Sequence, residues 1–351
     1  MPKGKLLEKD GKRVLGVEFA PTHLPLERRL QTASIIAWFL IMIAWPLVSY
    51  PVFFYATFFT QHGYLFTIPY LIWIYADKQQ CNKGGRKVGW TRRWKLWDHY
   101  RDYFPIKLVK TVDLPPGQNY LFGSHPHGIL CSGAFSTFAT DSHEVEKLFP
   151  GLSFSVLTLE INFLLPLIRD LILGLGVCSA TRESMNYLLS RPGGGVAAVL
   201  IPGGAPESLD SHPGSYVVQL KNKKGFIKVA MQNGASLVPV FSFGETEIFD
   251  QLANPKGSFL RTIQDKLQQM FQIAPAAFHG RGVFQYSFGP LPRRRAITTV
   301  VGAPIPVKKI AQPTLEELNA MHQRYVDAVV ELFYKHRDEY AHDPTHVIAI
   351  V

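Results

Sequence analysis

Two histidines in the segment Ser124-His125-Pro126-His127-Gly128 are the residues of this sequence best suited to acid–base chemistry. An imidazole has an ordinary pKa of about 6.5, so it can take up a proton near neutral pH. Pro126 fixes its own backbone angle and restricts His125, while Gly128 lets a substrate approach His127 closely. The segment therefore indicates a general base, with a metal-binding or structural His-x-His pair as the alternative.

A second glycine-rich segment, Pro202-Gly203-Gly204-Ala205-Pro206-Glu207-Ser208, follows the apolar run 196–201. If this run and the run before the histidines form neighbouring strands, Glu207 can reach the histidine loop. A carboxylate bonded to an imidazole N–H fixes the tautomer and stabilises the imidazolium that forms on proton uptake. The N–H groups of Gly203 and Gly204 are suited to bind an oxyanion or a phosphate. A glutamate that only caps a helix is the alternative.

Cationic side chains elsewhere in the chain are candidates for binding an anionic substrate. Lysines surround the start of an expected helix at 225–232, where a helix N-terminus and cations together hold phosphate groups such as those of coenzyme A. The same lysines also fit a solvated basic face. His279-Gly280-Arg281-Gly282 is a glycine-flanked turn that either lines the same cleft or only punctuates the fold. The lysines are Lys221, Lys223, Lys224 and Lys228, and Arg293-Arg294-Arg295 fits the same two interpretations as well as anionic lipid.

An α/β sheet is the arrangement that would position these segments. The histidines follow the apolar run 120–122, which predicts a buried strand, and open α/β sheets keep their chemistry at the carboxyl ends of strands. Strands and helices then alternate, which predicts a sheet with helices on both faces. The other strands are expected at 154–158, 196–201 and 237–243, and helices at 133–149, 183–190 and 225–232. Apolar residues at helical spacing in 259–270 and 318–332 are expected to face the core.

The segment 31–76 contains no Asp, Glu, Lys or Arg. It is twice the roughly 20 residues that a helix needs to cross a bilayer, and Gln61-His62-Gly63 is a turn signal in its middle. We therefore predict a membrane-embedded hairpin with spans at 33–58 and 64–76. Because the second span is short and three prolines interrupt the pair, a re-entrant wedge in one leaflet is an alternative, and a buried hairpin of a soluble protein is another. Basic residues on both flanks place both ends in the cytosol.

Four regions follow from this pattern. They are a cytosolic N-terminal segment at 1–30, the hairpin at 31–76, an interfacial amphipathic segment at 77–105 and a cytosol-facing α/β domain at 106–351. The third region interleaves aromatic and basic residues, as helices at the headgroup level do, and a helix that packs into the core is the alternative. Its aromatic residues are Trp90, Trp94, Trp97, Tyr100, Tyr103 and Phe104.

The composition limits the class of protein. Of the 351 residues, 47% are hydrophobic and only 18% are charged, which is too apolar for a simple soluble enzyme. The formal net charge of +10 favours an anionic partner, and without an RNA-binding or zinc-finger signature nucleic acid is not expected. Three widely spaced cysteines argue against a disulfide framework and favour a reducing compartment.

Several short blocks occur in an order that resembles the type-2 diacylglycerol acyltransferase family, which also contains the monoacylglycerol and wax-alcohol acyltransferases. The stretches 17–21 and 278–289 look most like the monoacylglycerol branch. One departure is Phe39-Leu40-Ile41-Met42, where the family has a Phe-Leu-x-Leu motif for neutral lipid. The blocks are Tyr103-Phe104-Pro105, His125-Pro126-His127-Gly128, Pro166 with Arg169, Gly203-Gly204 with Glu207, Lys224-Gly225-Phe226, Val238-Pro239 with Phe243-Gly244, and Val301-Gly302-Ala303-Pro304.

The resemblance implies a membrane-anchored mixed sheet flanked by helices, similar to glycerolipid acyltransferases, at the endoplasmic reticulum and lipid droplets. It also implies an acyl group moved from acyl-CoA, a co-substrate, to a lipid hydroxyl, with no bound cofactor and no metal. The expected partners are acyl-CoA, a monoacylglycerol or related lipid alcohol and membrane lipid, and a homo-oligomer stays open.

Our hypothesis is that His127, oriented by Glu207, deprotonates the free hydroxyl of a monoacylglycerol, which attacks the thioester directly. His125 then shapes the loop or binds the thioester oxygen. The alternatives are a diacylglycerol or wax-alcohol acyltransferase, a non-catalytic lipid-droplet protein, and a metal hydrolase using His125, His127 and His279. The residues expected to bind substrate are Gly128, Gly203, Gly204, Arg169, Lys224, Lys228, His279 and Arg281.

Overall fold

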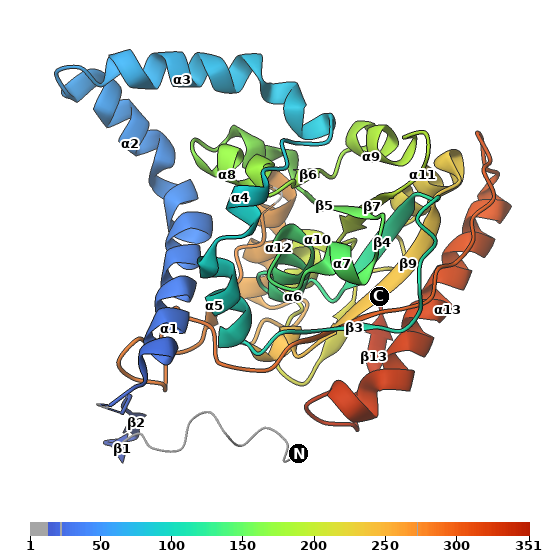
Figure 1. The fold of residues 1–351 in the computed structure, drawn as a ribbon. Helices are drawn as coiled ribbons and strands as arrows, with labels where there is room; N and C mark the ends of the chain where they lie inside the picture. The colour runs from blue at the N-terminus through green and yellow to red at the C-terminus, as the bar shows by residue number, and fades with distance from the viewer. Residues whose placement is uncertain (1–12, 22, 272) are drawn as a thin grey trace.

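The structure is a computed structural model that describes residues 13–21, 23–271 and 273–351. The first twelve residues of the region expected at 1–30 therefore lie outside the described part. A seven-stranded sheet forms the centre of the molecule (Figure 1). Its order is β3 (Lys107–Lys110), β12 (Thr298–Val301), β9 (Ser236–Phe243), β4 (Tyr120–His125), β7 (Val196–Leu200), β5 (Ser153–Thr158) and β6 (Cys178–Ser179).

The sheet is mixed, because β12 runs antiparallel to β9 while the other neighbouring pairs are parallel. This confirms the predicted α/β class with a mixed sheet. The carboxyl ends of β4, β7 and β5 lie at one edge, since Gly123 pairs with Leu200 and Val156 with Val199. Within the described residues there are also three two-stranded pairs, namely β1 (Arg13–Val14) with β2 (Val17–Glu18), β10 (Asp250–Gln251) with β11 (Phe278–His279), and β8 (Tyr216–Val218) with β13 (Ile348–Ile350).

Helices cover both faces of the sheet because its strands are apolar on both sides. Tyr120 and Phe122 face one core cluster, whereas Leu121 between them faces the other. The first cluster includes residues of α1 (Leu26–Phe39), α5 (Lys95–Tyr103), the π-helix Phe135–Ala139, α7 (Val145–Leu148) and α8 (Ile168–Gly174). The second includes residues of α9 (Arg182–Leu189), α11 (Gly225–Asn233) and α13 (Leu315–Tyr340).

The helix expected at 133–149 is broken into two parts, because the backbone is extended at Thr140 and left-handed at Glu144. The first part is α6 (Ser132–Ala134) continued by the π-helix, and the second is α7. The remaining short elements are α4 (Gly89–Arg92), α10 (Gly204–Ser208) and the 3₁₀ turns Lys78–Asn82, Glu160–Leu164 and Glu245–Glu247.

One N-terminal helix is long and apolar enough to cross a membrane among the described residues, and it runs from Leu26 to Phe59. It consists of α1, a π-helical turn at Leu40–Ala44 and α2 (Trp45–Phe59), and it is followed by α3 (Tyr64–Ala76). Figure 1 shows α2 and α3 projecting from the body. The helix starts earlier than the expected span at 33–58, and its first half packs on α5 with Ile35 and Trp38 buried.

The segment 77–105 was expected to lie at the membrane interface, and four of its aromatic side chains do not. Trp97, Tyr100, Tyr103 and Phe104 are buried in the same core cluster as the sheet, so they are not available to lipid headgroups. For these four side chains the core-packing alternative is the right one. Trp90 is exposed, and a position of this residue at a membrane surface stays a prediction.

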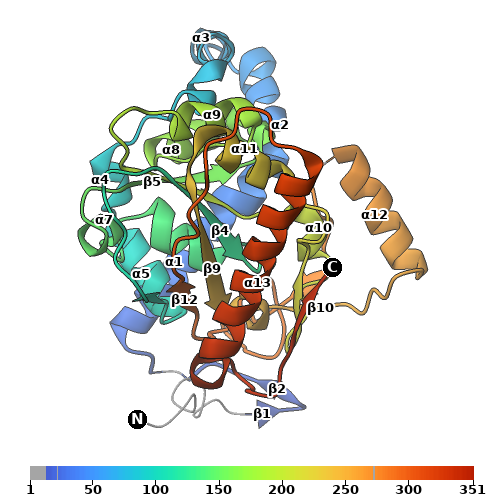
Figure 2. The same cartoon turned by 90° about the vertical axis from the view of Figure 1, so that its right-hand side faces the viewer.

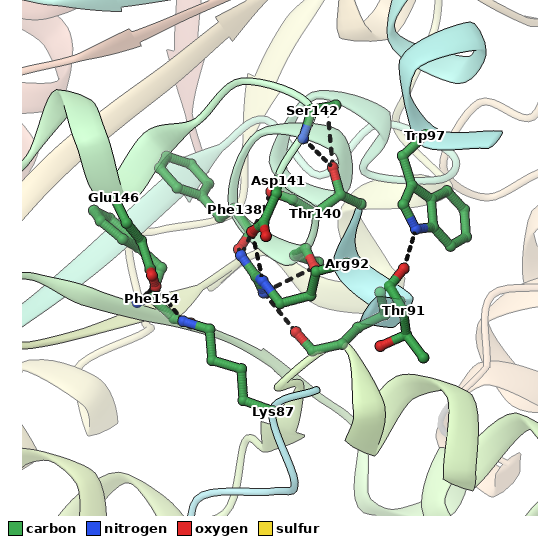
Figure 3. Close-up of polar contacts among 12 residues, drawn as sticks. Lys87, Thr91, Arg92, Trp97, Phe138, Thr140, Asp141, Ser142, Glu146 and Phe154 are labelled. Carbon is green, nitrogen blue, oxygen red and sulfur yellow. Dashed lines mark hydrogen bonds and ion pairs between the residues drawn. The ribbon is translucent and has the colours of Figure 1, made fainter. Parts of the chain in front are cut away.

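Arg92 explains why this segment belongs to the body (Figure 3). Its buried guanidinium donates to Asp141 at 2.7 Å and to the carbonyl oxygens of Ala139 and Leu175 at 2.9 and 2.6 Å. The side chain thereby joins α4 to the end of the π-helix and to the end of α8.

The apolar residues at helical spacing in 259–270 and in 318–332 differ in burial. Tyr325, Val329 and Leu332 of α13 are buried as expected. The stripe of α12 (Phe259–Phe271) is not core, since Phe259 is 83% and Met270 is 71% exposed, and α12 stands away from the body (Figure 2). The expectation was wrong because α12 attaches through its polar face, where buried Arg261 pairs with Asp210 at 2.6 Å.

Candidate active site

The two histidines take different positions at the end of β4. His125 is the last residue of the strand and is fully buried. Its Nε2 lies 3.0 Å from the hydroxyl of Tyr325, which itself donates to the carbonyl oxygen of Gly123 at 3.1 Å. The hydroxyl of Tyr325 therefore accepts a hydrogen bond from Nε2–H of His125. The other ring nitrogen, Nδ1, carries no proton and has no hydrogen-bond partner. Burial lowers the pKa of His125 to about 3.

His125 is therefore a neutral imidazole held inside the protein. Without a proton on Nδ1 it cannot donate a hydrogen bond to a thioester oxygen, so of its two expected roles, shaping the loop is the one that fits.

His127 lies on the loop after the strand and is partly buried. Its Nδ1 is 3.0 Å from the carbonyl oxygen of Gly128 and 2.9 Å from Oγ of Ser208. A carbonyl oxygen only accepts, whereas a serine hydroxyl can also accept, so a proton on Nδ1 satisfies both contacts and leaves the lone pair on Nε2. Nε2 makes no hydrogen bond to the described residues. Burial lowers the pKa of His127 below its ordinary value, while the bond to Gly128 opposes that shift.

Glu207 reaches the histidine loop as expected, but it contacts the backbone and not the ring. One oxygen accepts from the main-chain N–H of His127, and the other accepts from the N–H of Gln219 at 2.8 Å. The carboxylate therefore fixes the loop, and Ser208 takes the place beside the imidazole that was expected for it. Burial raises the pKa of Glu207 to about 7, while the two N–H groups and the charge of Lys223 favour its ionised form.

A second buried carboxylate, Glu245, holds the other end of the loop. Its oxygens accept from the N–H groups of Ser132 and Gly133 at 2.7 and 2.8 Å. Burial raises its pKa to about 8. Sequence reasoning missed this residue, and the signal that could have found it is a glutamate placed directly after the strand 236–243 and Gly244.

Two glycines of the site are required by close contacts. A Cβ on Gly128 would lie 2.6 Å from Cγ of Glu245, and the residue has φ +60°. A Cβ on Gly203 would overlap the carboxylate of Glu207. Gly204 begins α10 with φ +61° and has room beside it. The histidine loop and the glycine turn themselves are joined by the bond from the N–H of His127 to Glu207.

The residues expected to bind substrate fall into two groups. Lys224 and Lys228 are partly exposed at the start of α11, where Nζ of Lys224 donates to Asn319 at 2.7 Å. Of the four lysines, Lys223 is the one whose charge acts on Glu207. His279 is partly exposed on β11, with Nδ1 3.9 Å from Asp250.

Arg169 and Arg281, by contrast, are buried and form ion pairs or hydrogen bonds with other residues of the protein. Arg169 pairs with Asp77 at 2.5 Å and donates to the carbonyl oxygen of Phe163 at 3.2 Å. Arg281 donates to the hydroxyl of Tyr103 at 2.8 Å. Both were expected to contact substrate, and in the structure they hold secondary structure elements together instead.

Metal ligation and the cavity beside α10 also bear on the chemistry of the site. The described residues contain no group of three or more His, Cys, Asp or Glu side chains placed to hold a metal ion, which the metal-hydrolase alternative needs from His125, His127 and His279. A cavity of about 520 Å³ lies beside α10 and is lined by neither histidine of the loop, and its polar lining includes Asp210, His212, Gln251, Asn254 and Arg261.

Comparison with known proteins gives the family. The model of the family described as diacylglycerol acyltransferase matches residues 55–350. The chain belongs to the diacylglycerol acyltransferase family. The predicted family is thereby confirmed, and the match spans both the histidine loop and the glycine turn.

The relatives of this family member cover most of its length. The 2-acylglycerol O-acyltransferase 1 of Homo sapiens is 45% identical, over 92% of this chain and 96% of the relative. Diacylglycerol O-acyltransferase 2 of Dictyostelium discoideum is 42% identical over 94% and 98%, and that of Homo sapiens is 40% identical over 93% and 84%. The protein is thus an acyltransferase of lipid biosynthesis, and its apolar helix is a candidate membrane anchor.

Among solved structures, the 1-acyl-sn-glycerophosphate (LPA) acyltransferase PlsC from Thermotoga maritima matches 88% of this chain and 97% of its own. The identity is 13% and the TM-score is 0.38.

Proposed function

We propose that the protein transfers the acyl group of an acyl-CoA to a hydroxyl of a monoacylglycerol, with His127 as the general base. The observation that carries this proposal is the state of the ring, whose Nδ1–H is bound by the Gly128 carbonyl and whose Nε2 keeps a free lone pair. A neutral imidazole with a lowered pKa is unprotonated at pH 7 and ready to accept a proton.

The reaction needs no acyl-enzyme. Nε2 of His127 takes the proton of the acceptor hydroxyl while the hydroxyl oxygen bonds to the thioester carbon. The C–S bond of the tetrahedral intermediate then breaks, and the coenzyme A thiolate leaves and receives the proton from Nε2. A positioned base contributes about 10²–10⁴-fold to such a rate.

The two buried glutamates position this base. Glu207 binds the main-chain N–H of His127, and Glu245 binds the N–H groups just after the loop. Because each carboxylate contacts backbone and not the ring, they fix where Nε2 points without taking part in the proton transfer.

The lysine cluster is the part of the site suited to the coenzyme. Lys221, Lys223, Lys224 and Lys228 lie around the N-terminus of the nine-residue helix α11, where cations and main-chain N–H groups together bind phosphate. We assign the phosphates of acyl-CoA to this cluster.

The acceptor is assigned from two observations. The relatives named 2-acylglycerol O-acyltransferase 1 reach 45% identity, while those named diacylglycerol O-acyltransferase 2 reach 40–42%. The apolar faces of α2 and α3 are exposed, which fits a hairpin in the endoplasmic reticulum membrane with the α/β domain in the cytosol. A lipid acceptor then reaches the site from the bilayer.

An acceptor panel tests this function. Purified protein in lipid vesicles is given labelled oleoyl-CoA with 2-monoacylglycerol, diacylglycerol or a long-chain alcohol. We expect labelled diacylglycerol to form at the highest kcat/KM. A preference for diacylglycerol or alcohol would reassign the acceptor within the family, and the absence of any ester product would overturn the function.

A further inference from the structure

The turn after β5 exposes apolar side chains in a row. Leu159, Ile161, Leu164 and Leu167 are each between 42% and 53% exposed, and Glu160 is the one charged residue among residues 159–167. We call this segment the apolar shelf. Isolated leucines on a surface need no explanation, but four within nine residues form a patch of the kind that contacts an apolar partner.

The shelf is joined to the apolar N-terminal helices by hydrogen bonds. The hydroxyl of Tyr50 in α2 donates to the carbonyl oxygen of Leu164, and the indole N–H of Trp45 donates to that of Pro166, both at 2.8 Å. The main-chain N–H of Leu167 donates to the hydroxyl of Tyr70 in α3 at 2.8 Å. The shelf is therefore continuous with α2 and α3.

These bonds complete the backbone of an irregular segment. The carbonyl oxygens of Phe163 and Leu165 accept from Nε and the main-chain N–H of Arg169, at 3.2 and 3.0 Å. The carbonyl oxygen of Leu167 accepts from the N–H of Leu171. Every carbonyl from 163 to 167 thus has a donor. Irregular backbone survives next to hydrocarbon only when its polar groups are bound internally, and the carbonyl oxygens of 163–167 meet this condition.

Two cations lie beside aromatic rings at the end of α3. Nζ of Lys78 lies 4.5 Å from the ring centre of Tyr75, and the guanidinium of Arg86 lies 5.1 Å from that of Trp73. Cations beside Trp and Tyr rings are typical of the boundary between headgroups and acyl chains.

We propose that the apolar shelf enters the acyl-chain region of the bilayer as a third membrane-embedded element beside α2 and α3. It directly follows the carboxyl end of β5, at the sheet edge that also carries the loop of His127. The shelf therefore brings a lipid acceptor from the bilayer to the sheet edge where its hydroxyl can meet His127. This delivery of the lipid acceptor rests on the proposed function, whereas the insertion into the bilayer does not.

A depth measurement tests the insertion. A nitroxide label is attached to Leu164→Cys and to Leu315→Cys in the full chain, in phosphatidylcholine vesicles, with the unmutated chain as the labelling background. Leu315 is a matched control, since it is an exposed leucine on α13 in the α/β domain. We expect the label at 164 to collide more with oxygen, which concentrates in the acyl-chain region, and less with a water-soluble nickel complex. Equal exposure to the nickel complex at the two positions would overturn the insertion.

An activity measurement tests the delivery of the acceptor. We expect Ile161→Glu/Leu164→Glu to raise the KM for monoacylglycerol in vesicles at least tenfold and to leave the KM for acyl-CoA unchanged, with Leu315→Glu as the control. An unchanged KM for monoacylglycerol would overturn the delivery step. A lipid-exposed label in a protein that makes no ester would uphold the insertion and overturn the proposed function alone.

Discussion

At the scale of single residues, the site consists of one imidazole whose tautomer is set by a carbonyl and whose loop is set by two buried carboxylates. The pKa of Glu207 is raised to about 7 and that of Glu245 to about 8 because both are buried. The pKa of His127 is lowered for the same reason. Proton occupancy of the two glutamates therefore changes near pH 7 and pH 8, whereas His127 stays unprotonated there.

The pH dependence of acyl transfer follows from these directions. Ionised Glu207 accepts two N–H groups, so the rate is expected to fall as the pH decreases through about 7, and to fall again below 6.5 as His127 becomes protonated. The side chain of Glu207→Gln has one accepting oxygen where the carboxylate has two, so the plateau rate should be lower. Because glutamine does not titrate, the decrease near pH 7 should disappear. The measurement is kcat/KM from pH 5 to 9, with Glu331→Gln as an exposed control. A decrease near pH 7 that persists in Glu207→Gln would refute this role.

Gly128 is a position where one methyl group should be costly. Its φ of +60° strains any other residue, and a Cβ would lie 2.6 Å from Cγ of Glu245. We expect Gly128→Ala to destabilise the protein by about 1–3 kcal/mol and to reduce kcat through displacement of His127. Thermal unfolding and initial rates check this. Gly117→Ala is the matched control, because no atom lies within 4 Å of its Cβ and its φ is not positive, and an equal effect at both glycines would contradict the steric explanation.

At the scale of elements, buried charged side chains connect helices and loops that are distant in the sequence. Glu245 binds the first N–H groups of the helical run 132–139, where a carboxylate also meets the positive end of the helix dipole. Arg92 binds carbonyl oxygens at the opposite end of the same run. The run after the histidine loop is therefore held at both ends.

Glu245 should make stability depend on pH. Its pKa is raised in the folded protein, so between about pH 4.5 and 8 the unfolded chain binds fewer protons than the folded one, and stability decreases as the pH rises. Glu207 acts in the same direction. We expect Tm to decrease less steeply from pH 5 to 8 in Glu245→Gln than in the wild type, as measured by differential scanning fluorimetry. An unchanged slope, equal to that of Glu331→Gln, would count against a buried ionisable Glu245.

Arg92 gives a second prediction about elements. Arg92→Ala leaves Asp141 and the carbonyl oxygens of Ala139 and Leu175 without their donor, and breaking a buried ion pair costs about 3–5 kcal/mol. Arg93 is exposed one residue later, so Arg93→Ala should change the free energy of unfolding by less than about 0.5 kcal/mol. Denaturant unfolding of both variants measures the difference, and similar losses would show that Arg92 does not join these elements.

At the scale of the whole molecule, α1, the first half of the N-terminal helix, packs into the core of the α/β domain. Trp38 and Ile35 of α1 belong to the core cluster of the sheet, and Arg294 donates to Gln31 at 2.6 Å. A chain truncated before residue 77 would expose this core and leave buried arginines without partners.

This truncation is expected to abolish folding. We expect the chain from residue 77 onward to aggregate on size-exclusion chromatography and to lose its near-UV circular dichroism, even in detergent. A monodisperse truncated chain that still acylates a detergent-solubilised monoacylglycerol would show that α1 is only an anchor.

Four of the seven strands of the sheet, their shared edge and the meeting of the two glycine-rich loops could be predicted from the sequence, because apolar runs and glycine turns are local signals. The strands β3, β6 and β12 were not predicted. It did not show which charged residues face inward. Arg169 and Arg281 were expected at a substrate, yet they are buried in ion pairs and hydrogen bonds formed with residues far away in the chain. Glu245 was missed for the same reason, since its partners Ser132 and Gly133 are more than a hundred residues away.

The role of His127 is tested most directly by acyl transfer in the His127→Ala protein. Saturating oleoyl-CoA and 2-monoacylglycerol are supplied in vesicles, and His342→Ala, an exposed histidine near the C-terminus, is the matched control. We predict a decrease of about 10²–10⁴-fold in kcat for His127→Ala with an unchanged melting temperature, and a wild-type rate for His342→Ala. A wild-type kcat in His127→Ala would contradict the assignment of this imidazole as the base.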